Sequence, residues 1–341
     1  MPKTRQAVEQ AAQLKIYTPQ LDRLEDKLNE WIEQERYQAL VIKVNRYGVP
    51  IFEGCYGTST NDSGVSLDTI FPVMSNSKLI ISALIMTLLE GGYLKLEEPV
   101  FRFIPEYTGG GRENINIWHL LTHTSGLNDE GEILNPPRKV MLYCNYGYNK
   151  LRDIICAITG ESIDNYAQRV LFGPLGMLDT HWVLPEHKWG RVLGRNEKCM
   201  GYDWINSESC FVNESGAGGL KSTVNDMIKF CEMILNKGRY ENNRVLSPAS
   251  VHEMTKNHNP EFENPFDSWG LGWNYRGTKV DNAGDLRSAD AIEHGGWAGH
   301  RLLVDPVYGL TVVKYSGSYG EHDGELSIWG RISNMIIAAC E

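Results

Sequence analysis

The sequence lacks the features that would assign it to a membrane, disordered or repeat class. Its 341 residues contain no low-complexity tract and no block of like charge. No apolar run reaches the roughly 18 residues that a membrane span needs. The N-terminal segment also lacks the apolar core of a secretory signal, so we expect a cytoplasmic protein, although an exported chain whose signal had been removed would look the same.

Paired cysteines and a basic charge balance are missing as well. The seven cysteines are scattered with no CxxC pair, which is typical of reduced thiols rather than of a disulfide framework or a zinc site. The formal net charge is −10, which argues against nucleic acid or an anionic membrane as the main partner. What remains is an ordinary globular composition, 42% hydrophobic and 22% charged, in a chain long enough to bury a large core.

Hydrophobic periodicity predicts strands near both ends of the chain and helices between them. Apolar residues at helical spacing predict a helix over residues 19–35, and a turn at Asn45–Gly48 then joins two predicted strands. The last ninety residues contain three strand-like segments, "GLGWNYRG", "HRLLVD" and "LTVVKYSG", and a closing amphipathic helix. This pattern predicts an α+β fold, with one antiparallel sheet built from the N- and C-terminal segments and flanked by helices.

The same pattern predicts two interleaved domains. Residues 1–70 and 235–341 are expected to form an α/β domain that contains the sheet. Residues 71–234, where the patterns are mostly helical, are expected to form an inserted helical domain, with the active site at the interface between the two.

The most apolar predicted helix begins with a serine and a lysine. In "FPVMSNSKLIISALIMTLLEGG", residues 71–92, Ser75 is followed three residues later by Lys78. Positions i and i+3 share one face of a helix, so the hydroxyl and the amine can meet. Burial disfavours the ammonium form and lowers the lysine pKa, and a neutral amine can take the serine proton. This spacing also arises by chance, so it needs support from other motifs.

Two further motifs supply that support. Tyr143 and Asn145 stand two apart, ahead of a helix predicted to begin near Tyr148, and can direct a phenol and an amide into one cleft. The phenol can transfer protons and the amide can hold a substrate carbonyl. Further on, His294-Gly295-Gly296 enters a predicted strand, where the glycines would let a substrate lie against the backbone. The backbone N–H of Trp297 is then a candidate oxyanion donor.

These three motifs, SxxK, YxN and HxG in this order, resemble those of the serine β-lactamase/DD-peptidase family, in its class C β-lactamase, esterase and D-aminopeptidase branch. The resemblance extends over residues 20–340 through five more segments in family order: "LKLEEPVFRFIPEY", "INIWHLLTHTSGL", "LFGPLGMLDT", "GAGGLKSTVNDMIKF" and "WGLGW". It implies a β-lactamase/transpeptidase-like fold, with a sheet of terminal segments, a helical insert and a site between them.

The resemblance also implies roles for the motif residues. Ser75 corresponds to the acylated nucleophile, Lys78 to its proton acceptor and Tyr143 to the second proton-transfer group. The oxyanion hole corresponds to the backbone N–H groups of Ser75 and Trp297. The substrate-binding and oxyanion residues that it implies are Asn145, His294, Gly296 and Trp297. No metal or organic cofactor is implied, and the implied partner is a small ester or amide substrate.

The sequence departs from the family pattern at two positions. His294 stands where most β-lactamases and penicillin-binding proteins have lysine, and histidine is mostly neutral near pH 7, which weakens recognition of a substrate carboxylate. We expect the neutral ring to donate a hydrogen bond to the substrate or to Tyr143, and Arg301 is a candidate for a substitute cation. Cys144 stands where the family often has serine, and we expect its side chain to face away from the substrate.

We therefore expect a serine hydrolase that acts through an acyl-enzyme, of the carboxylesterase type, on small esters or amides. The alternatives are a D-amino-acid peptidase or amidase, a β-lactamase, an acyltransferase, and a catalytically silent relative that binds a ligand. His123 invites a Ser–His triad, but the SxxK scheme already contains its base, so we expect a structural role. A rival HxG at His322 lacks a strand setting, and His294 is preferred.

Overall fold

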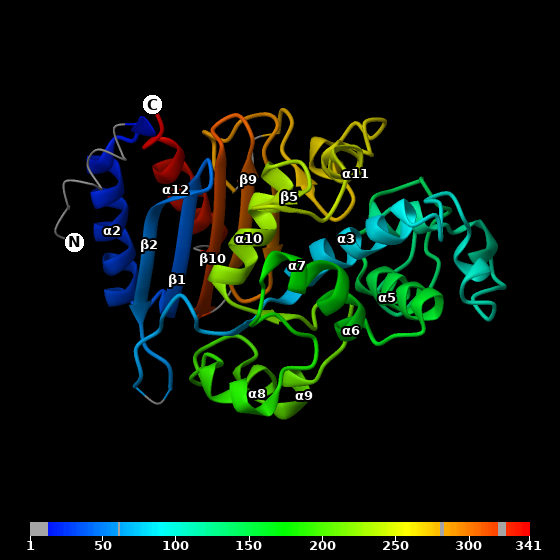
Figure 1. The fold of residues 1–341 in the computed structure, drawn as a ribbon, viewed down its shortest axis with the longest axis horizontal. Coiled ribbons are helices and arrows are strands. Elements are labelled where there is room, and N and C mark those ends of the chain that lie inside the picture. The colour runs from blue at the N-terminus through cyan, green and yellow to red at the C-terminus, as the bar shows by residue number, and fades with distance from the viewer. Residues whose placement is uncertain (1–12, 61, 280–282, 320–324) are drawn as a thin grey trace.

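The computed structural model of the protein describes residues 13–60, 62–279, 283–319 and 325–341. Its centre is a six-stranded antiparallel sheet in the order β2-β1-β10-β9-β8-β7 (Figure 1). The strands are β1 (Tyr37–Arg46), β2 (Val49–Gly57), β7 (Asn274–Tyr275), β8 (Ile292–Gly296), β9 (His300–Asp305) and β10 (Leu310–Ser318). The expected antiparallel sheet of N- and C-terminal segments is therefore confirmed.

Strands from opposite ends of the sequence meet in the middle of the sheet. β1 pairs with β10 in a register that runs from Tyr37 opposite Ser318 to Arg46 opposite Leu310. The predicted turn between β1 and β2 is confirmed at Tyr47-Gly48. The segment "GLGWNYRG" was expected to be a full strand, and this is wrong, because only the two residues of β7 pair. Gly272 has a φ of +83°, in the left-handed region, which no extended strand contains.

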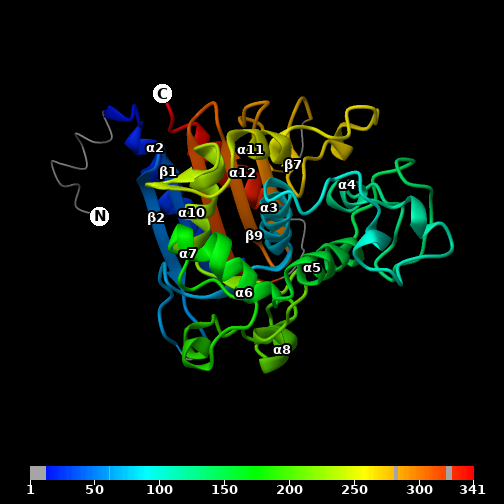
Figure 2. The ribbon, with the colours of Figure 1, turned by 45° about the vertical axis from the view of Figure 1, so that its right-hand side comes forward.

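Helices cover both faces of the sheet (Figures 1 and 2). The strand side chains alternate between the two faces. On β1, Leu40, Ile42 and Val44 belong to one hydrophobic core, whereas Ala39 and Val41 belong to the other. The first core contains α2 (Thr18–Glu33) and α12 (Glu325–Ile337), and the second contains α10 (Val224–Leu235) and α3 (Ser77–Glu90).

Helices α4 and α5 lie to one side of the sheet, where α5 packs against α3 (Figure 2), and α8 and α9 lie below the sheet in the view of Figure 1. The other helices are α4 (Ile117–Leu121), α5 (Asn145–Thr159), α6 (Ile163–Ala167), α7 (Gly173–Leu175), α8 (Tyr202–Ile205), α9 (Glu208–Phe211) and α11 (Pro248–Thr255). Two short ribbons, β3 (Phe71–Pro72) with β4 (Lys221–Ser222) and β5 (Arg239–Tyr240) with β6 (Asn243–Arg244), complete the fold.

The segment 71–234, expected to form the helical domain, also contributes to the sheet layer. Its last helix, α10, packs directly on β10, β9 and β1. The division into two domains stays a prediction. Among the described residues, no helix is both long enough and apolar enough to cross a membrane.

Candidate active site

Ser75 lies in a tight turn at the start of the apolar helix. The turn is a 3-10 segment, η1 (Met74–Asn76), which runs directly into α3. Met74 has a φ of +52°, a left-handed conformation that a side chain seldom adopts without support from its surroundings. That support comes from Ser77, whose Oγ donates to the Met74 carbonyl at 2.6 Å and accepts from the Leu220 N–H at 3.0 Å.

Lys78 lies on the first turn of α3, three residues after Ser75. It is fully buried, and its amine contacts the serine. Nζ lies 3.1 Å from Ser75 Oγ, 2.7 Å from Asn145 Oδ1 and 2.9 Å from the Ala217 carbonyl oxygen. Burial lowers the pKa of this amine to about 7, against the opposing charge of Asp129. A neutral amine has two N–H groups and one lone pair. Because both carbonyl oxygens can only accept, they take the two N–H groups, and the lone pair faces Ser75 Oγ.

A second buried lysine shows what distinguishes this arrangement. Burial also lowers the pKa of Lys221 to about 7, and this side chain is fully buried beside α3. Its Nζ donates to three backbone carbonyls, those of Trp182, Asn213 (3.2 Å) and Gly219 (2.6 Å). All three partners are carbonyls, which can only accept, so none of them has a proton that Lys221 could take. Of these two lysines, only Lys78 has a partner, the Ser75 hydroxyl, that can itself donate.

Tyr143 and His294 face each other above the serine. The phenol oxygen lies 3.2 Å from His294 Nε2, and His294 Nδ1 lies 2.6 Å from the Gly272 carbonyl oxygen. A carbonyl can only accept, so Nδ1 carries the proton, Nε2 is bare, and the tyrosine hydroxyl donates to it. The expectation that His294 donates to Tyr143 or the substrate is therefore wrong, because its single proton is bound to the backbone.

Burial sets the ionisation of both groups. Burial, together with the charge of the nearby Lys78, lowers the pKa of His294 to about 3, so the ring is neutral at physiological pH. Burial also raises the pKa of the Tyr143 phenol above its usual value, while its hydrogen bond with Ser75 opposes the rise. The phenol therefore enters the reaction protonated, as a group that can give a proton.

His123 supports the tyrosine from behind. Its ring stacks on the Tyr143 ring with centroids 4.4 Å apart, and its Nδ1 accepts from the Cys144 N–H at 3.0 Å. Burial lowers the pKa of His123 well below its ordinary value, so this ring is neutral as well. Its contacts with the phenol and the backbone agree with the structural role expected for it.

The YxN motif is arranged differently from the prediction. Helix α5 begins at Asn145, three residues before the predicted start at Tyr148, so Asn145 lies on the first turn of a helix and not on a loop. The early start follows from Cys144, whose Sγ accepts from the Gly147 N–H at 3.4 Å and caps the helix. The Cys144 side chain is buried and its Sγ donates to the Asn128 carbonyl at 3.3 Å, which agrees with the expectation that it faces away from the substrate.

The HxG strand is held against the nucleophile turn. Asn76 Nδ2 donates to the His294 carbonyl at 2.9 Å. A Cβ on Gly296 would lie 2.6 Å from the Val73 carbonyl oxygen, closer than real side chains approach. Gly296 is therefore needed for the contact with the nucleophile turn, and the role beside the substrate that the sequence predicts for it stays a prediction. Trp297, the next residue, is 42% exposed at the end of β8.

The Arg301 side chain lies on the opposite face of the sheet from His294, and its charge is only the last of the effects that lower the His294 pKa. It pairs with Gly295 on β8, whereas His294 pairs with Leu302. Leu302 belongs to the core on the α3 side of the sheet and Leu303 to the core on the α12 side. Because side chains alternate along a strand, Arg301 leaves the sheet on the side of Leu303, opposite to His294.

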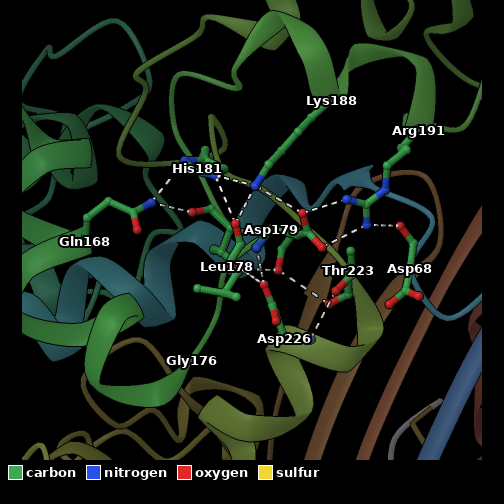
Figure 3. Close-up of polar contacts among 12 residues, drawn as sticks. Asp68, Gln168, Gly176, Leu178, Asp179, His181, Lys188, Arg191, Thr223 and Asp226 are labelled. Carbon is green, nitrogen blue, oxygen red and sulfur yellow. Dashed lines mark hydrogen bonds and ion pairs between the residues drawn. The ribbon is translucent and has the colours of Figure 1, made fainter.

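A polar network supports the ribbon that leads into the nucleophile turn (Figure 3). β3, directly before this turn, pairs with β4, and the Lys221 backbone of β4 bonds in turn to His181 at 2.8 and 2.9 Å. The neighbouring Asp179 accepts two hydrogen bonds from Arg191, at 2.7 and 2.8 Å, and its N–H donates to Asp226 Oδ2 at 2.7 Å. The segment "LFGPLGMLDT" thus has a scaffolding role.

The structure brings Ser75, Lys78, Tyr143, Asn145 and His294 into one connected cluster. Sequence reasoning missed the carbonyls of Ala217 and Gly272, since a backbone oxygen has no side-chain signature. It also missed Asp129, which contacts Asn145. The rival motif at His322 lies outside the described residues. Within the described ranges, no group of three or more His, Cys, Asp or Glu side chains is arranged to hold a metal ion.

Comparison with known proteins identifies the family. The sequence model of the beta-lactamase family matches residues 21–332. The chain belongs to the beta-lactamase family. It is therefore a serine hydrolase of the type to which β-lactamases and DD-peptidases belong, and the resemblance seen in the sequence is confirmed.

Relatives in the beta-lactamase family bear several different names. The chain is 24% identical to esterase EstB of Burkholderia gladioli over 370 residues, which cover 90% of this chain and 93% of the relative. It is 22% identical to a putative D-alanyl-D-alanine carboxypeptidase of Escherichia coli K12 over 363 residues, which cover 85% and 81% of the two chains. Simvastatin synthase (LovD) of Aspergillus terreus has the same fold, with a TM-score of 0.77 at 18% identity, covering 94% of this chain and 98% of that one.

Proposed function

We propose that the protein is a carboxylesterase-type hydrolase that cleaves small esters or amides without a carboxylate near the scissile bond. The reaction proceeds through an acyl-enzyme on Ser75. Lys78 takes the serine proton as Oγ attacks the carbonyl carbon, and the backbone N–H groups of Ser75 and Trp297 stabilise the oxyanion. Tyr143 gives its proton to the leaving group and regains one from the Lys78 ammonium, while Asn145 contacts the substrate carbonyl or amide. Water then attacks the acyl-enzyme, one of its protons returns to Ser75 Oγ through the same groups, and the acid is released.

The observation that carries the proposal is that, among the residues the structure describes, no charged side chain is hydrogen-bonded to the His294 ring of the third motif. His294 is buried and neutral, with its one proton bound to the Gly272 carbonyl. Arg301, the candidate substitute, leaves the strand on the opposite face. A substrate carboxylate placed beside His294 would gain no charge-assisted hydrogen bond, which is worth about 1.5–3 kcal/mol. A neutral acyl substrate needs no such hydrogen bond, so the neutral histidine does not reduce its binding free energy.

The arrangement of Lys78 supports an active enzyme over a silent ligand-binding relative. A buried amine whose lone pair faces a serine hydroxyl at 3.1 Å carries a burial cost that ligand binding alone would not need. EstB, the relative named as an esterase, is similar over 90% of this chain, which agrees with the proposed class.

The test is a comparison of kcat/KM on three substrates: p-nitrophenyl butyrate, nitrocefin and D-alanine p-nitroanilide. We expect the ester to have the highest value. A nitrocefin value above the ester value would favour a β-lactamase, and a dominant D-alanine anilide activity would favour the peptidase. Transfer of the acyl group to an added alcohol in preference to water would favour an acyltransferase.

Labelling with a fluorophosphonate decides between an enzyme and a silent relative. We expect a single adduct on Ser75 by peptide mass spectrometry, and none in Ser75→Ala. Because this substitution is conservative, it should cost at most about 1 kcal/mol of stability. If the wild-type chain remains unlabelled while folded, the acyl-enzyme proposal is overturned.

A further inference from the structure

Asp129 holds the asparagine of the YxN motif with both carboxylate oxygens. Oδ1 accepts from the backbone N–H of Asn145 at 2.6 Å, and Oδ2 accepts from its side-chain Nδ2 at 2.8 Å. Asp129 is an exposed residue on the loop that follows "HTSGL", sixteen residues before its partner. One carboxylate therefore anchors both the first turn of α5 and the amide that projects from it.

This contact determines which way the Asn145 amide points. A carboxylate can only accept, so the NH2 group must face Asp129, and Oδ1 must then face Lys78 Nζ at 2.7 Å. The reversed amide would place Oδ1 against the carboxylate and the NH2 group against the amine. Asp129 thus excludes an orientation that Asn145 alone would be free to adopt.

The amide orientation in turn directs the lysine lone pair. With Asn145 Oδ1 and the Ala217 carbonyl each taking one N–H of the neutral amine, the lone pair is left for Ser75 Oγ. If the amide turned, Nδ2 would compete for that lone pair as a donor. We propose that Asp129 is a positioning residue, which fixes the Asn145 amide and thereby directs the lone pair of Lys78 at the nucleophile; this rests on the proposed role of Lys78 as the base.

Asp129 also acts on Lys78 through its charge. The carboxylate is the largest factor that raises the pKa of Lys78 against the effect of burial, followed by Cys144. The other titratable groups that face the amine are neutral imidazoles and protonated phenols: His123, His294, Tyr143 and Tyr148. Removal of the carboxylate should therefore lower the pKa of Lys78 and misdirect its lone pair at the same time.

A lower pKa makes more of Lys78 neutral at low pH, whereas a misdirected lone pair slows the reaction at every pH. This combination distinguishes a positioning role from simple damage to the fold. In Asp129→Ala and Asp129→Asn we expect the plateau kcat at high pH to fall about tenfold to a hundredfold, the scale of a misplaced catalytic group. The acidic limb of the kcat/KM profile should move to lower pH by about half a unit. A loss of folded protein would reduce the plateau without moving the limb.

Glu130→Gln is the matched control, since it removes an exposed carboxylate one residue away. It should leave the plateau kcat within about twofold of wild type, and it should move the acidic limb of the pH profile by no more than about 0.1 unit. The proposal would be overturned if both Asp129 variants kept the wild-type kcat and the wild-type position of the acidic limb. It would also be overturned if Glu130→Gln showed the lower kcat and the shifted limb expected for the Asp129 variants.

A second measurement keeps this inference separate from the proposed function. NMR titration of the Lys78 side chain needs no turnover, and it should show a lower pKa in Asp129→Asn than in the wild type. If the wild-type protein takes no fluorophosphonate, the proposed function fails, but the titration still reports whether Asp129 acts on Lys78. If the protein is labelled and the titration and profiles are unchanged, only the positioning role fails.

Discussion

The Nδ1 atom of His294 lies 2.6 Å from the carbonyl oxygen of Gly272, and this contact fixes the tautomer of the ring. The only N–H of the neutral ring donates to the Gly272 carbonyl oxygen, so the ring offers the site only an acceptor, Nε2. The tyrosine hydroxyl fills that acceptor at 3.2 Å. The third motif of this protein thus orients the phenol instead of presenting a positive charge.

Replacement of this histidine by lysine should change substrate preference. We expect His294→Lys to raise the rate on carboxylate-bearing substrates relative to neutral esters by about tenfold, which corresponds to ~1.4 kcal/mol of differential binding. The absolute ester rate should fall, because an ammonium cannot accept the Tyr143 hydrogen bond. The measurement is the ratio of kcat/KM for nitrocefin to that for p-nitrophenyl butyrate. His322→Lys, at the rival motif, should leave the ratio unchanged, and a reversed result would mean that the third motif has been misplaced.

The pH dependence of the reaction should report the amine. The pKa of Lys78 is lowered to about 7, and only its neutral form accepts a proton, so kcat/KM should rise with pH and level off above pH 7. Below that value the rate should fall tenfold for each pH unit. His294, with a pKa of about 3, should add no second step between pH 5 and 9. A profile that is flat from pH 5 to 8 would show that Lys78 is not the base.

Two adjacent glycines should tolerate substitution differently. A Cβ on Gly296 would lie 2.6 Å from the Val73 carbonyl oxygen, which is backbone and cannot move away. A Cβ on Gly295 would meet Arg301 Nη1 at 2.5 Å, the end of a flexible side chain. We expect Gly296→Ala to lower kcat by about a hundredfold because it separates β8 from the nucleophile turn. Gly295→Ala should remain within threefold, and equal losses in both variants would contradict this reading.

The buried lysines Lys78 and Lys221 should separate stability from catalysis. Lys221→Met leaves three buried carbonyls without a donor, at a cost of about 1–3 kcal/mol each, so the midpoint of urea unfolding should drop markedly. The protein that remains folded should still react with the fluorophosphonate. Lys78→Met leaves two acceptors without a donor, the Ala217 carbonyl and Asn145 Oδ1, instead of three, so it should unfold closer to wild type and show no labelling. An inactive but fully stable Lys221→Met would contradict the assignment of a structural role.

The sequence predicted the fold well where periodicity and turn chemistry agree. The helix expected at residues 19–35 is observed at Thr18–Glu33, and the hairpin turn lies where Asn45–Gly48 placed it. The prediction failed at β7, where apolar residues suggested a strand but the conformation of Gly272 interrupts it. That glycine instead brings its carbonyl oxygen to His294. This is a tertiary contact, and the local hydrophobic pattern gives no sign of it.

The sequence predicted which side chains form the site, but it did not predict most of the hydrogen bonds between them. The SxxK spacing predicted the contact between Ser75 and Lys78, because helix geometry alone brings them together. The direction of the hydrogen bond between Tyr143 and His294 was predicted wrongly, since it depends on a carbonyl 22 residues away in the chain. The contact between Asp129 and Asn145 likewise depends on the path of a loop.

The order of strands in the sheet has a consequence for how the chain folds during synthesis. β1 emerges from the ribosome early, yet its neighbour in the sheet is β10, whose last residue, Ser318, pairs with Tyr37. The bond from Asn76 to the His294 carbonyl likewise joins groups 218 residues apart. Contacts of such long range form slowly, because a long loop must close before they stabilise anything. A nascent chain that has exposed Ser75 and Lys78 therefore cannot yet assemble the site, and the nucleophile acquires its full environment only after β10 has been made.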